Sequence, residues 1–305
     1  MQGFLPLCLV KSALFGKFLV SLPYLNRAGL AAEDLLIQSA LVDKACDLAD
    51  ELDVKYLELR HGQPVEHPKL TVRRDEKKRM VLDLPDTPEV LWKGFDAKVR
   101  NQIRKGEKSG LTIRFGGVSL LDDFYNVFTV NMRDLGTPVY SKRLFKEIVN
   151  LRSVASQHEV AKSGVQQDGA ELVVVNWEGK PVAGALLVHD LPLAHQPATT
   201  QVPSASSLRS AASTNANMWM YHQMLLRAME RGSQQFDFGR SSIDSGTYKF
   251  KKQWGATAHD TVWQYYVRKG DVGEVRPDNP KYQRRIAMWQ RLPVWLTRVI
   301  GPTIV

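Results

Sequence analysis

Hydrophobic and polar positions follow two periods along the chain, and these periods separate the predicted strands from the predicted helices. Residues 54–60 alternate as in a half-buried strand, and residues 171–189 form two apolar runs around Glu178-Gly179, the clearest predicted β-hairpin. Apolar positions that recur every three or four residues predict helices over 31–52 and 214–231. The further strands expected from short apolar runs are 4–10, 18–22, 79–84, 111–115, 199–205, 235–239 and 261–267. The further helices expected are 88–109, 119–134, 142–155 and a short one at 248–254.

The order of these elements predicts an α/β fold with two related halves. Residues 118–268 carry two helices, three strands and then alternating helices and strands, and the earlier segment resembles a shorter version of the same order. We therefore expect an N-terminal half over 1–116, a complete domain over 117–270 and a basic, Trp-containing tail over 271–305. The first half is expected to be incomplete at its start, because strand-like residues begin at position 4 with no preceding element to pair them.

The helix predicted over 88–109 separates its apolar and charged residues. Thr87 is expected to cap this helix, Pro88 fits its first turn, and Gly110 ends it. A single acid, Glu107, accompanies the basic residues of one arc, which are Lys93, Lys98, Arg100, Arg104, Lys105 and Lys108. Such an arc is either a solvated helix surface or a site for an anion, in which case Arg100 and Arg104 are candidate binding residues.

Composition and charge narrow the class of protein. Hydrophobic residues at 44% and charged residues at 24% are typical of a globular chain and exclude a disordered, collagen-like or disulfide-stapled one. Lys and Arg number 41 against 32 Asp and Glu, and the net charge of +9 predicts an anionic partner. Cys8 and Cys46 fit no metal or redox spacing and indicate a reducing compartment. The seven histidines form no HxxxH or HExxH pattern, so a zinc hydrolase is excluded and no metal is predicted.

No membrane span or secretory signal is predicted. The apolar stretch over 4–25 is interrupted by Lys11, Lys17, Pro6 and Pro23, whereas a bilayer span needs about 20 mostly apolar residues in a row. We therefore expect a cytoplasmic protein.

The most informative stretch for chemistry is residues 236–256. A strand brings Asp237 to the end of a sheet, Gly239 lets the backbone turn, and Arg240 follows directly. A polar loop and then Lys249, Lys251 and Lys252 come next, so an arginine and several lysines are available for a phosphate or carboxylate group. The alternative is that Asp237 and Arg240 form a salt bridge that merely fixes a surface loop.

A second candidate stretch is residues 203–209, which follow another predicted strand. Its serines and arginine can donate hydrogen bonds to an oxyanion or an amide, or they form an ordinary serine-rich loop. The candidate binding residues here are Ser204, Ser206, Ser207 and Arg209. Asn215 and Asn217, at the start of the next helix, serve either as caps or, for Asn217, in substrate binding.

These stretches resemble a known family. RSSIDSGTYKFKKQWG at 240–255, KVRNQIRKGEKSGL at 98–111, and PSASSLRS before TNANMWMYHQML are similar to FemAB-related proteins of exopolysaccharide and PEP-CTERM systems, within the FemAB/BioF2-like acetyltransferase superfamily. The resemblance runs from SLPYLN near residue 21 to YQRRIAMWQRLPVWL near residue 296. It implies two GNAT-like α/β domains in tandem, with mixed central sheets flanked by helices. In FemAB transferases such domains move an aminoacyl group from aminoacyl-tRNA to a peptide amine of a cell-wall precursor.

The resemblance also implies roles for individual residues. The Tyr-Lys-Phe-Lys pattern, Tyr248 to Lys251, is similar to the FemAB segment whose Phe-Lys pair meets the donor, here Phe250 and Lys251. The RNxIRK pattern matches Arg100, Asn101, Ile103, Arg104 and Lys105. We expect Lys251 to hold the negative charge that develops on the carbonyl oxygen, and Asp237 to orient or deprotonate the amine. Arg240, Tyr248, Lys249 and Phe250 complete the expected substrate-binding set.

The sequence departs from the family pattern in two ways that concern the donor. It lacks the Q/RxxGxG/A pyrophosphate loop of CoA-dependent GNAT enzymes, and it lacks the inserted coiled-coil arm of tRNA-dependent ones. No cofactor is predicted, and the donor stays open between aminoacyl-tRNA and acyl-CoA.

Three functions follow from these observations. The first is an acyl- or aminoacyl-transferase that acts on an amine of an anionic or lipid-linked envelope or exopolysaccharide precursor. The others are a CoA-dependent N-acetyltransferase and a non-catalytic module that binds an anionic glycan or precursor. The tail over 280–305 either packs on the first domain or rests on an anionic membrane, which would make the protein peripheral to the inner membrane.

Overall fold

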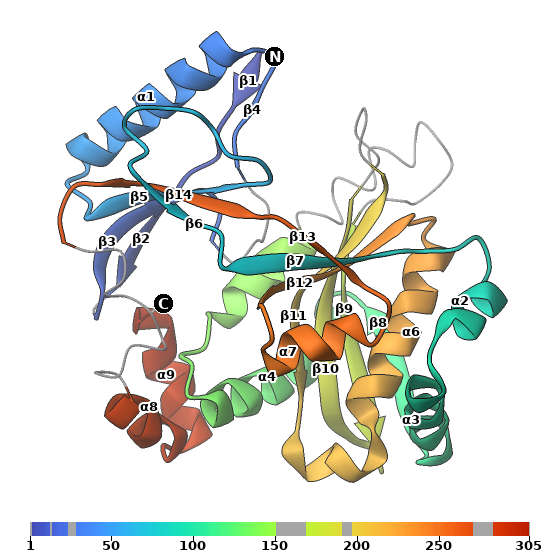
Figure 1. The fold of residues 1–305 in the computed structure, drawn as a ribbon. Helices are drawn as coiled ribbons and strands as arrows, with labels where there is room; N and C mark the ends of the chain where they lie inside the picture. Colours follow the sequence, from blue (N-terminus) through green and yellow to red (C-terminus); the bar gives the residue numbers. More distant parts are fainter. Residues whose placement is uncertain are drawn as a thin grey trace.

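The computed structural model describes residues 2–12, 14–23, 29–150, 169–190, 197–270 and 283–304. The described residues form a large sheet of seven strands, in the order β13-β7-β12-β11-β10-β9-β8, and a small sheet of five strands, in the order β2-β3-β5-β14-β6 (Figure 1). A short ladder joins β1 (Gly3–Phe4) to β4 (Ala31–Ala32). Both sheets contain parallel and antiparallel pairs and carry helices, so the expected α/β class with mixed sheets is confirmed.

The strands of the two sheets have the following bounds. The large sheet contains β7 (Lys77–Asp83), β8 (Thr112–Gly116), β9 (Gly169–Trp177), β10 (Lys180–Asp190), β11 (Thr199–Ser207), β12 (Gln235–Ser242) and β13 (Thr257–His259). The small sheet contains β2 (Cys8–Ser12), β3 (Gly16–Val20), β5 (Tyr56–His61), β6 (Val72–Arg74) and β14 (Val262–Val267).

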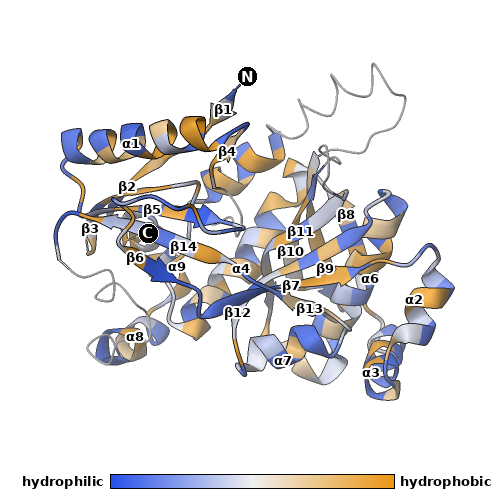
Figure 2. Ribbon diagram, turned by 45° about the horizontal axis from the view of Figure 1, so that its top comes forward, coloured by the Kyte–Doolittle hydropathy of each residue, from blue (hydrophilic) through white to orange (hydrophobic). Residues whose placement is uncertain are grey.

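The small sheet is covered on one side by α1 (Leu35–Glu51). Asp34 caps this helix by accepting a hydrogen bond from the backbone N–H of Ile37, and the helix buries Val42, Cys46 and Ala49 among others. In Figure 2, hydrophobic and hydrophilic bands alternate along α1, as expected of a helix that buries one side. The helix predicted over 31–52 therefore begins four residues later than expected, at Leu35, because residues 31–32 pair with β1.

The division of strands between the two sheets does not follow their order along the chain. β7 and β8 lie in the large sheet, where β7 pairs with β12, whereas β14 pairs with β5 in the small sheet. The expected boundaries at 116 and 270 therefore do not coincide with the division between the two sheets. Strand pairing depends on long-range register, which local sequence periods do not encode. The expected incompleteness of the first half stays a prediction.

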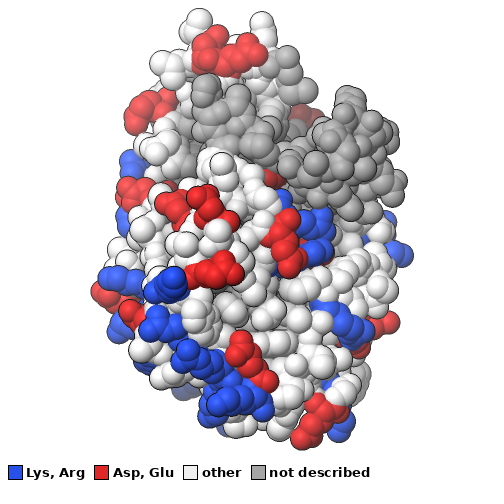
Figure 3. All heavy atoms as spheres, turned by 90° about the vertical axis from the view of Figure 1, so that its right-hand side faces the viewer, with Lys and Arg blue, Asp and Glu red and all other residues white. Residues whose placement is uncertain are grey.

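The single helix predicted over 88–109 is two helices, α2 (Pro88–Gly94) and α3 (Ala97–Lys108). Thr87 caps α2 as expected, but Phe95 adopts an extended conformation (ψ 143°) and ends it. The Arg100 guanidinium donates a hydrogen bond of 2.6 Å to the carbonyl oxygen of Phe95, which satisfies a helix-end acceptor. Figure 3 faces this side of the molecule and shows Lys and Arg side chains gathered toward its lower end. The exposed basic residues of α2 and α3 are Lys93, Lys98, Arg104, Lys105 and Lys108.

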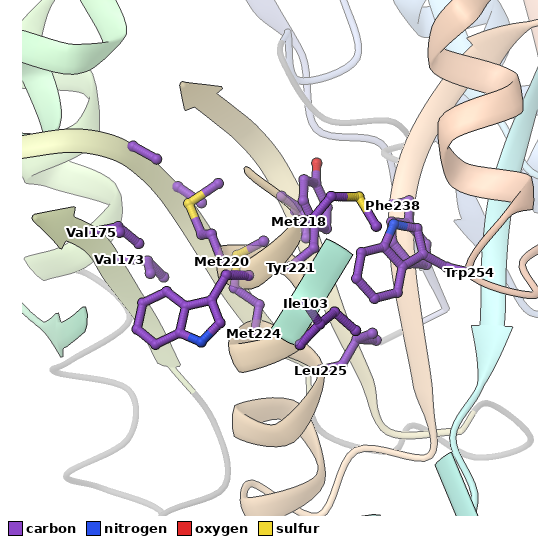
Figure 4. Packing of buried hydrophobic residues seen from close by; sticks show 14 of the residues in the cluster. Ile103, Val173, Val175, Met218, Met220, Tyr221, Met224, Leu225, Phe238 and Trp254 are labelled. Carbon is purple, nitrogen blue, oxygen red and sulfur yellow. The ribbon is translucent and has the colours of Figure 1, made fainter. Parts of the chain in front are cut away.

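The large sheet is buried on both faces. Within β9, Val173 and Val175 belong to one core and Leu172 and Val174 to another, so successive residues face opposite sides. The first core lies under α3 and α6 (Ala216–Glu230), and Figure 4 shows α6 side chains between Val173 and Val175 on one side and Trp254 on the other. The second core lies under α4 (Leu121–Leu135) and the helical residues 142–150. The rest of the predicted helix 142–155 lies outside the described residues.

The C-terminal helices α8 (Gln283–Gln290) and α9 (Val294–Ile304) pack against α4. Arg298 donates hydrogen bonds to Thr129 (3.0 Å) and Asn126 (2.9 Å), and a side chain at Gly301 would meet the backbone of Val139. The C-terminal tail therefore packs mainly on α4, not on the first domain as one alternative expected. Its contact with the first domain includes the hydrogen bond from Ser12 of β2 to the end of α9. Among the described helices, none is both long and apolar enough to cross a bilayer.

A buried ionic network joins α6 to the large sheet. Glu171 of β9 accepts two hydrogen bonds from the Arg227 guanidinium (2.9 and 3.0 Å), and its Oε1 lies 2.9 Å from Nε2 of His189 on β10. Nδ1 of His189 lies 2.8 Å from the Thr200 hydroxyl. Burial opposes ionisation of Glu171, but the hydrogen bonds from His189 and Arg227 outweigh it and lower the pKa of this carboxyl to about 2.

We predict that Glu171→Gln lowers the free energy of unfolding by about 3 kcal/mol near neutral pH, because it leaves partly buried guanidinium groups and the buried imidazole of His189 without their carboxylate. The folded pKa lies below the ordinary value of 4.5, so the contribution of Glu171 is present above pH 4.5 and is lost as the pH falls toward 2. Denaturant unfolding at several pH values measures this, with Glu230→Gln as the control, since Glu230 is an exposed partner of the same Arg227. Equal effects of the two variants would contradict the prediction.

Candidate functional site

The candidate site forms where β11 and β12 separate. Their parallel pairing runs from Thr199–Gln235 to Gln201–Asp237, while the strands continue to Ser207 and Ser242. On its other edge β12 pairs with β7, and the register shifts by one residue between Asp237 and Arg240. Gly239 lies in this bulge at φ +78°, a conformation that favours glycine. The bulge changes the direction of β12 at the point where its charged residues lie.

Asp237 is the buried acid of this site and is 1% exposed. Its Oδ1 accepts a hydrogen bond of 2.7 Å from the Gly239 N–H, and its Oδ2 lies 3.7 Å from the Arg79 guanidinium on β7. Its ion-pair partner is Arg79, so the alternative of an Asp237–Arg240 salt bridge is wrong. Burial raises the pKa of Asp237 despite the nearby Arg79.

Lys251 is held next to Asp237 by α7 (Gly246–Lys252), the short helix that the sequence predicts. Ser245 caps α7 by accepting a hydrogen bond from the Tyr248 N–H. Phe250 and Trp254 anchor this segment in the core, where the Phe250 ring lies 5.0 Å from Tyr221 and the Trp254 ring 5.3 Å from Phe95. Between these anchors Lys251 is directed to β12, and its Nζ donates a hydrogen bond of 3.1 Å to the carbonyl oxygen of Arg240.

The ammonium group of Lys251 is perturbed by its surroundings. Lys251 is 8% exposed, and burial lowers its pKa to about 8, with the charge of Asp237 acting in the opposite direction. Of the three N–H donors of a lysine, one is used by the Arg240 carbonyl among the described residues. Lys251 can therefore donate hydrogen bonds to a developing oxyanion and titrates close to neutral pH.

Arg240 contacts the small sheet through an aromatic ring. Its Cζ lies 3.4 Å from the Trp263 ring centroid on β14, and Cζ of Arg60 on β5 lies 4.1 Å from the same centroid. Glu58 accepts hydrogen bonds from Arg60 (2.8 Å) and Tyr265 (3.0 Å). Burial and then the charge of Arg60 lower the pKa of Arg240 to about 10. Positive charge thus accumulates where the two sheets meet.

Sequence reasoning missed Arg79, Arg60, Glu58 and Trp263. The alternating pattern of residues 54–60 could have indicated two of them. Glu58 and Arg60 lie on the same face of that strand, and both are charged where a half-buried strand usually carries apolar side chains. Arg79 and Trp263 reach the site through strand pairing between distant segments, which no local motif reports.

Ser204, Ser206 and Ser207, for which a serine-rich loop is one of the two expected alternatives, belong to β11. Ser204, Ser206 and Ser207 pair with Leu186, Gly184 and Ala183 of β10, because their backbone groups continue the ladder. Ser206 is buried and accepts a hydrogen bond of 3.2 Å from Asn131 of α4. The loop interpretation of these residues is therefore corrected, and the contact of Ser206 is with α4 rather than with the charged residues of β12.

A cavity of about 250 Å³ lies at the N-terminus of α6. Ser207, Arg209 and Asn217 are among its lining residues, together with Ala211 and Ala212. Arg209 is exposed, and its guanidinium lies 3.4 Å from the Asp134 carbonyl oxygen. Asn215 is the N-cap of α6 at φ 55° but makes no side-chain capping bond, so the expected cap is present in position only. This cavity is a second part of the candidate site.

The remaining predicted residues lie around these two parts. Tyr248 and Phe250 are half-buried against the first core, and Lys249 is exposed on α7. Arg100 is engaged with the Phe95 carbonyl, and Cζ of Arg104 lies 5.4 Å from the Trp92 ring centroid. The structure thus brings Asp237, Arg240 and Lys251 together, whereas Arg100 and Arg104 lie on α3. Among the described residues, no group of three or more His, Cys, Asp or Glu could hold a metal ion.

A family model described as an acetyltransferase (GNAT) domain matches residues 93–252, slightly more than half of the chain. The chain belongs to the GNAT acetyltransferase family. The matched segment contains Asp237, Arg240 and Lys251, and it ends before the β14 strand that carries Trp263.

Two solved structures support the arrangement of the whole GNAT chain. The crystal structure of FemX is 14% identical, with 93% of this chain and 87% of the FemX chain covered and a TM-score of 0.60. The structure of L-PGS from Bacillus licheniformis is 11% identical, with 97% and 89% covered and a TM-score of 0.52. At these identities the likeness shows the fold, which is the expected tandem GNAT-like α/β fold. The search of curated proteins found no match to this sequence.

We predict that Asp237→Asn lowers the pKa of Lys251 below about 8, because the charge of Asp237 is the main influence that raises it. A lysine side-chain NMR titration measures this pKa, with Lys251→Met used to assign the resonance. An unchanged pKa in Asp237→Asn would show that the two groups are not coupled.

Proposed function

We propose that this GNAT protein is an acyl- or aminoacyl-transferase of the FemAB type that acylates an amine of a cell-envelope or exopolysaccharide precursor. The observation that carries the proposal is Lys251, a buried ammonium group held beside Asp237 where β11 and β12 separate. The resemblance of residues 240–255 to FemAB-related proteins supports the choice of acceptor class.

The reaction needs two kinds of help from the protein. The amine attacks the carbonyl carbon of the donor, a C–N bond forms, and the carbonyl oxygen becomes negative until the alcohol or thiol leaves. Lys251 donates a hydrogen bond to that oxygen, and the proton of the amine passes to the leaving group or to water. Asp237 is too buried to reach an amine directly, so its role is to keep Lys251 protonated through its charge.

The charges at the junction of the sheets support an anionic acceptor. Glu58 and Asp237 pair with Arg60 and Arg79, and Arg240 and Lys251 add two further cations. A phosphate group on a soluble or lipid-linked precursor would balance this excess, since guanidinium groups bind phosphate through two parallel hydrogen bonds. We further propose a location on the cytoplasmic side of the inner membrane, with aminoacyl-tRNA as one donor and peripheral membrane contact through residues 271–305.

We predict that Lys251→Met lowers the rate of acyl transfer about 100- to 1,000-fold, because it removes one donor to the oxyanion. The experiment incubates the purified protein with amine-bearing envelope precursors and either aminoacyl-tRNA or acyl-CoA, and mass spectrometry detects the acylated product. Lys252→Met is the matched control, since Lys252 is the exposed neighbour on the same helix.

Two outcomes would contradict the proposal. Full transfer by Lys251→Met would remove Lys251 from the reaction. Tight, salt-sensitive binding of a precursor with no product from either donor would instead favour the non-catalytic binding module.

A CoA-dependent N-acetyltransferase is the second candidate, favoured by the cavity at the N-terminus of α6. Backbone N–H groups and the positive end of a helix dipole bind phosphate groups well, and small residues, Ala211 and Ala212, line this cavity. The cavity thus supports acyl-CoA as a donor even though the expected glycine-rich loop is missing.

If acyl-CoA is the donor, Ala212→Glu weakens CoA binding about 10-fold or more, because the new carboxylate repels the CoA phosphates at this helix end. Isothermal titration with CoA measures the affinity, and the neutral variant Ala212→Gln controls for side-chain size. Equal affinities of the two variants would place CoA elsewhere.

A further inference from the structure

The helices α8 and α9 are fixed to the protein on one side only. Ile286 and Trp289 face inward, since a side chain at Gly136 would meet Ile286 and Trp289 is buried. On α9 the inward residues are Thr297 and Gly301, and Arg298 bonds to α4. These contacts determine which residues of α8 and α9 face the protein and which face away from it.

The outer faces carry large apolar side chains. Trp295 is 67% exposed and Val299 is 66% exposed, and their spacing of four residues puts them side by side on α9. Met288 is exposed on α8. Exposed large apolar side chains on neighbouring helices are unusual in a protein surface that faces water alone.

The charge of this segment has one sign. Residues 283–304 contain four arginines and no aspartate or glutamate. Arg284 and Arg291, four residues before and three residues after Met288, are exposed, whereas Arg298 is used in the contact with α4. The surface therefore complements an anionic partner.

A turn of the small sheet extends the same surface. The Ser12 hydroxyl at the end of β2 donates a hydrogen bond of 2.5 Å to the Ile304 carbonyl oxygen, so the turn between β2 and β3 lies beside the end of α9. Figure 1 shows the C-terminus next to this end of the small sheet. Leu14 in this turn is exposed, and so is Lys11. The β2–β3 turn therefore carries exposed apolar and basic side chains, as α8 and α9 do, although it is far from these helices in the sequence.

We propose that α8, α9 and the β2–β3 turn form a docking surface for a bilayer that contains anionic phospholipids. Trp295, Val299, Met288 and Leu14 enter the interface between headgroups and acyl chains, and Arg284, Arg291 and Lys11 bind lipid phosphates. Indole rings prefer this interface, and basic side chains beside apolar ones add affinity for anionic lipid. A protein partner would need complementary acidic and apolar patches, whereas a bilayer supplies both along its whole surface. The proposal deepens the membrane contact proposed above for residues 271–305, and its test does not depend on acyl transfer, because the surface is separate from Lys251.

Vesicle co-sedimentation of the full chain tests this surface. We expect binding to vesicles of phosphatidylcholine with phosphatidylglycerol, weaker binding at high salt, and little binding to phosphatidylcholine alone. Trp295→Gln with Val299→Gln lowers the affinity about 10-fold or more, as does Arg284→Gln with Arg291→Gln. Trp emission shifts to the blue on binding in the wild-type protein and much less in Trp295→Phe.

The matched control is Leu35→Gln with Leu36→Gln on α1, where the two leucines are 80% and 83% exposed. This variant should bind as the wild-type protein does. Equal loss in the control, equal binding to neutral vesicles, or no vesicle binding would overturn the proposal. So would a dimer seen by light scattering that Trp295→Gln abolishes, because the face would then be an interface between two copies. Circular dichroism of each variant shows whether its fold is retained.

Discussion

The candidate site depends on the separation of two parallel strands. β11 and β12 pair at their beginnings and then part, and the bulge at Gly239 changes the course of β12 while β7 stays paired with it. The gap costs backbone hydrogen bonds, and the Lys251 ammonium restores one of them by bonding to the Arg240 carbonyl. The hydrogen bond from Lys251 to the Arg240 carbonyl oxygen therefore satisfies a backbone acceptor of β12 and also positions the Lys251 ammonium group.

This arrangement is stable because both sides of the site are anchored in packed cores. Phe250 and Trp254 fix α7 among aromatic rings, so Lys251 has little freedom to move away from β12. On the other side, Trp263 contacts Arg240 from the small sheet, whose strand β14 follows the large-sheet strand β13 in the chain. The exchange of β7 and β14 between the sheets thus links the two halves of the protein at the site itself. A displacement of Trp263 in the small sheet would therefore directly alter the contact of Arg240 in the large sheet.

Local sequence patterns predict those features that depend on neighbours in the chain. The hairpin of β9 and β10, the cap of α2 at Thr87 and the short helix around Lys251 follow from turn residues, capping residues and spacing. The break at Phe95 was missed because the apolar period continues across it into α3. The composition of residues 203–207 leaves an ordinary loop open as an alternative because small polar residues are common in loops, although here β10 pairs with Ser204, Ser206 and Ser207. Arg79 and Trp263 could not be predicted, since only the tertiary strand order brings them to Asp237 and Arg240.

The most direct measurement is a crystal structure with a non-hydrolysable acyl donor bound. We expect the donor carbonyl oxygen to lie within about 3 Å of the Lys251 ammonium group, in the gap between β11 and β12. The body of the donor should extend either into the cavity at the start of α6 or along the basic junction near Trp263. A donor whose carbonyl group lies away from Lys251, or outside this gap, would show that Lys251 does not stabilise the oxyanion.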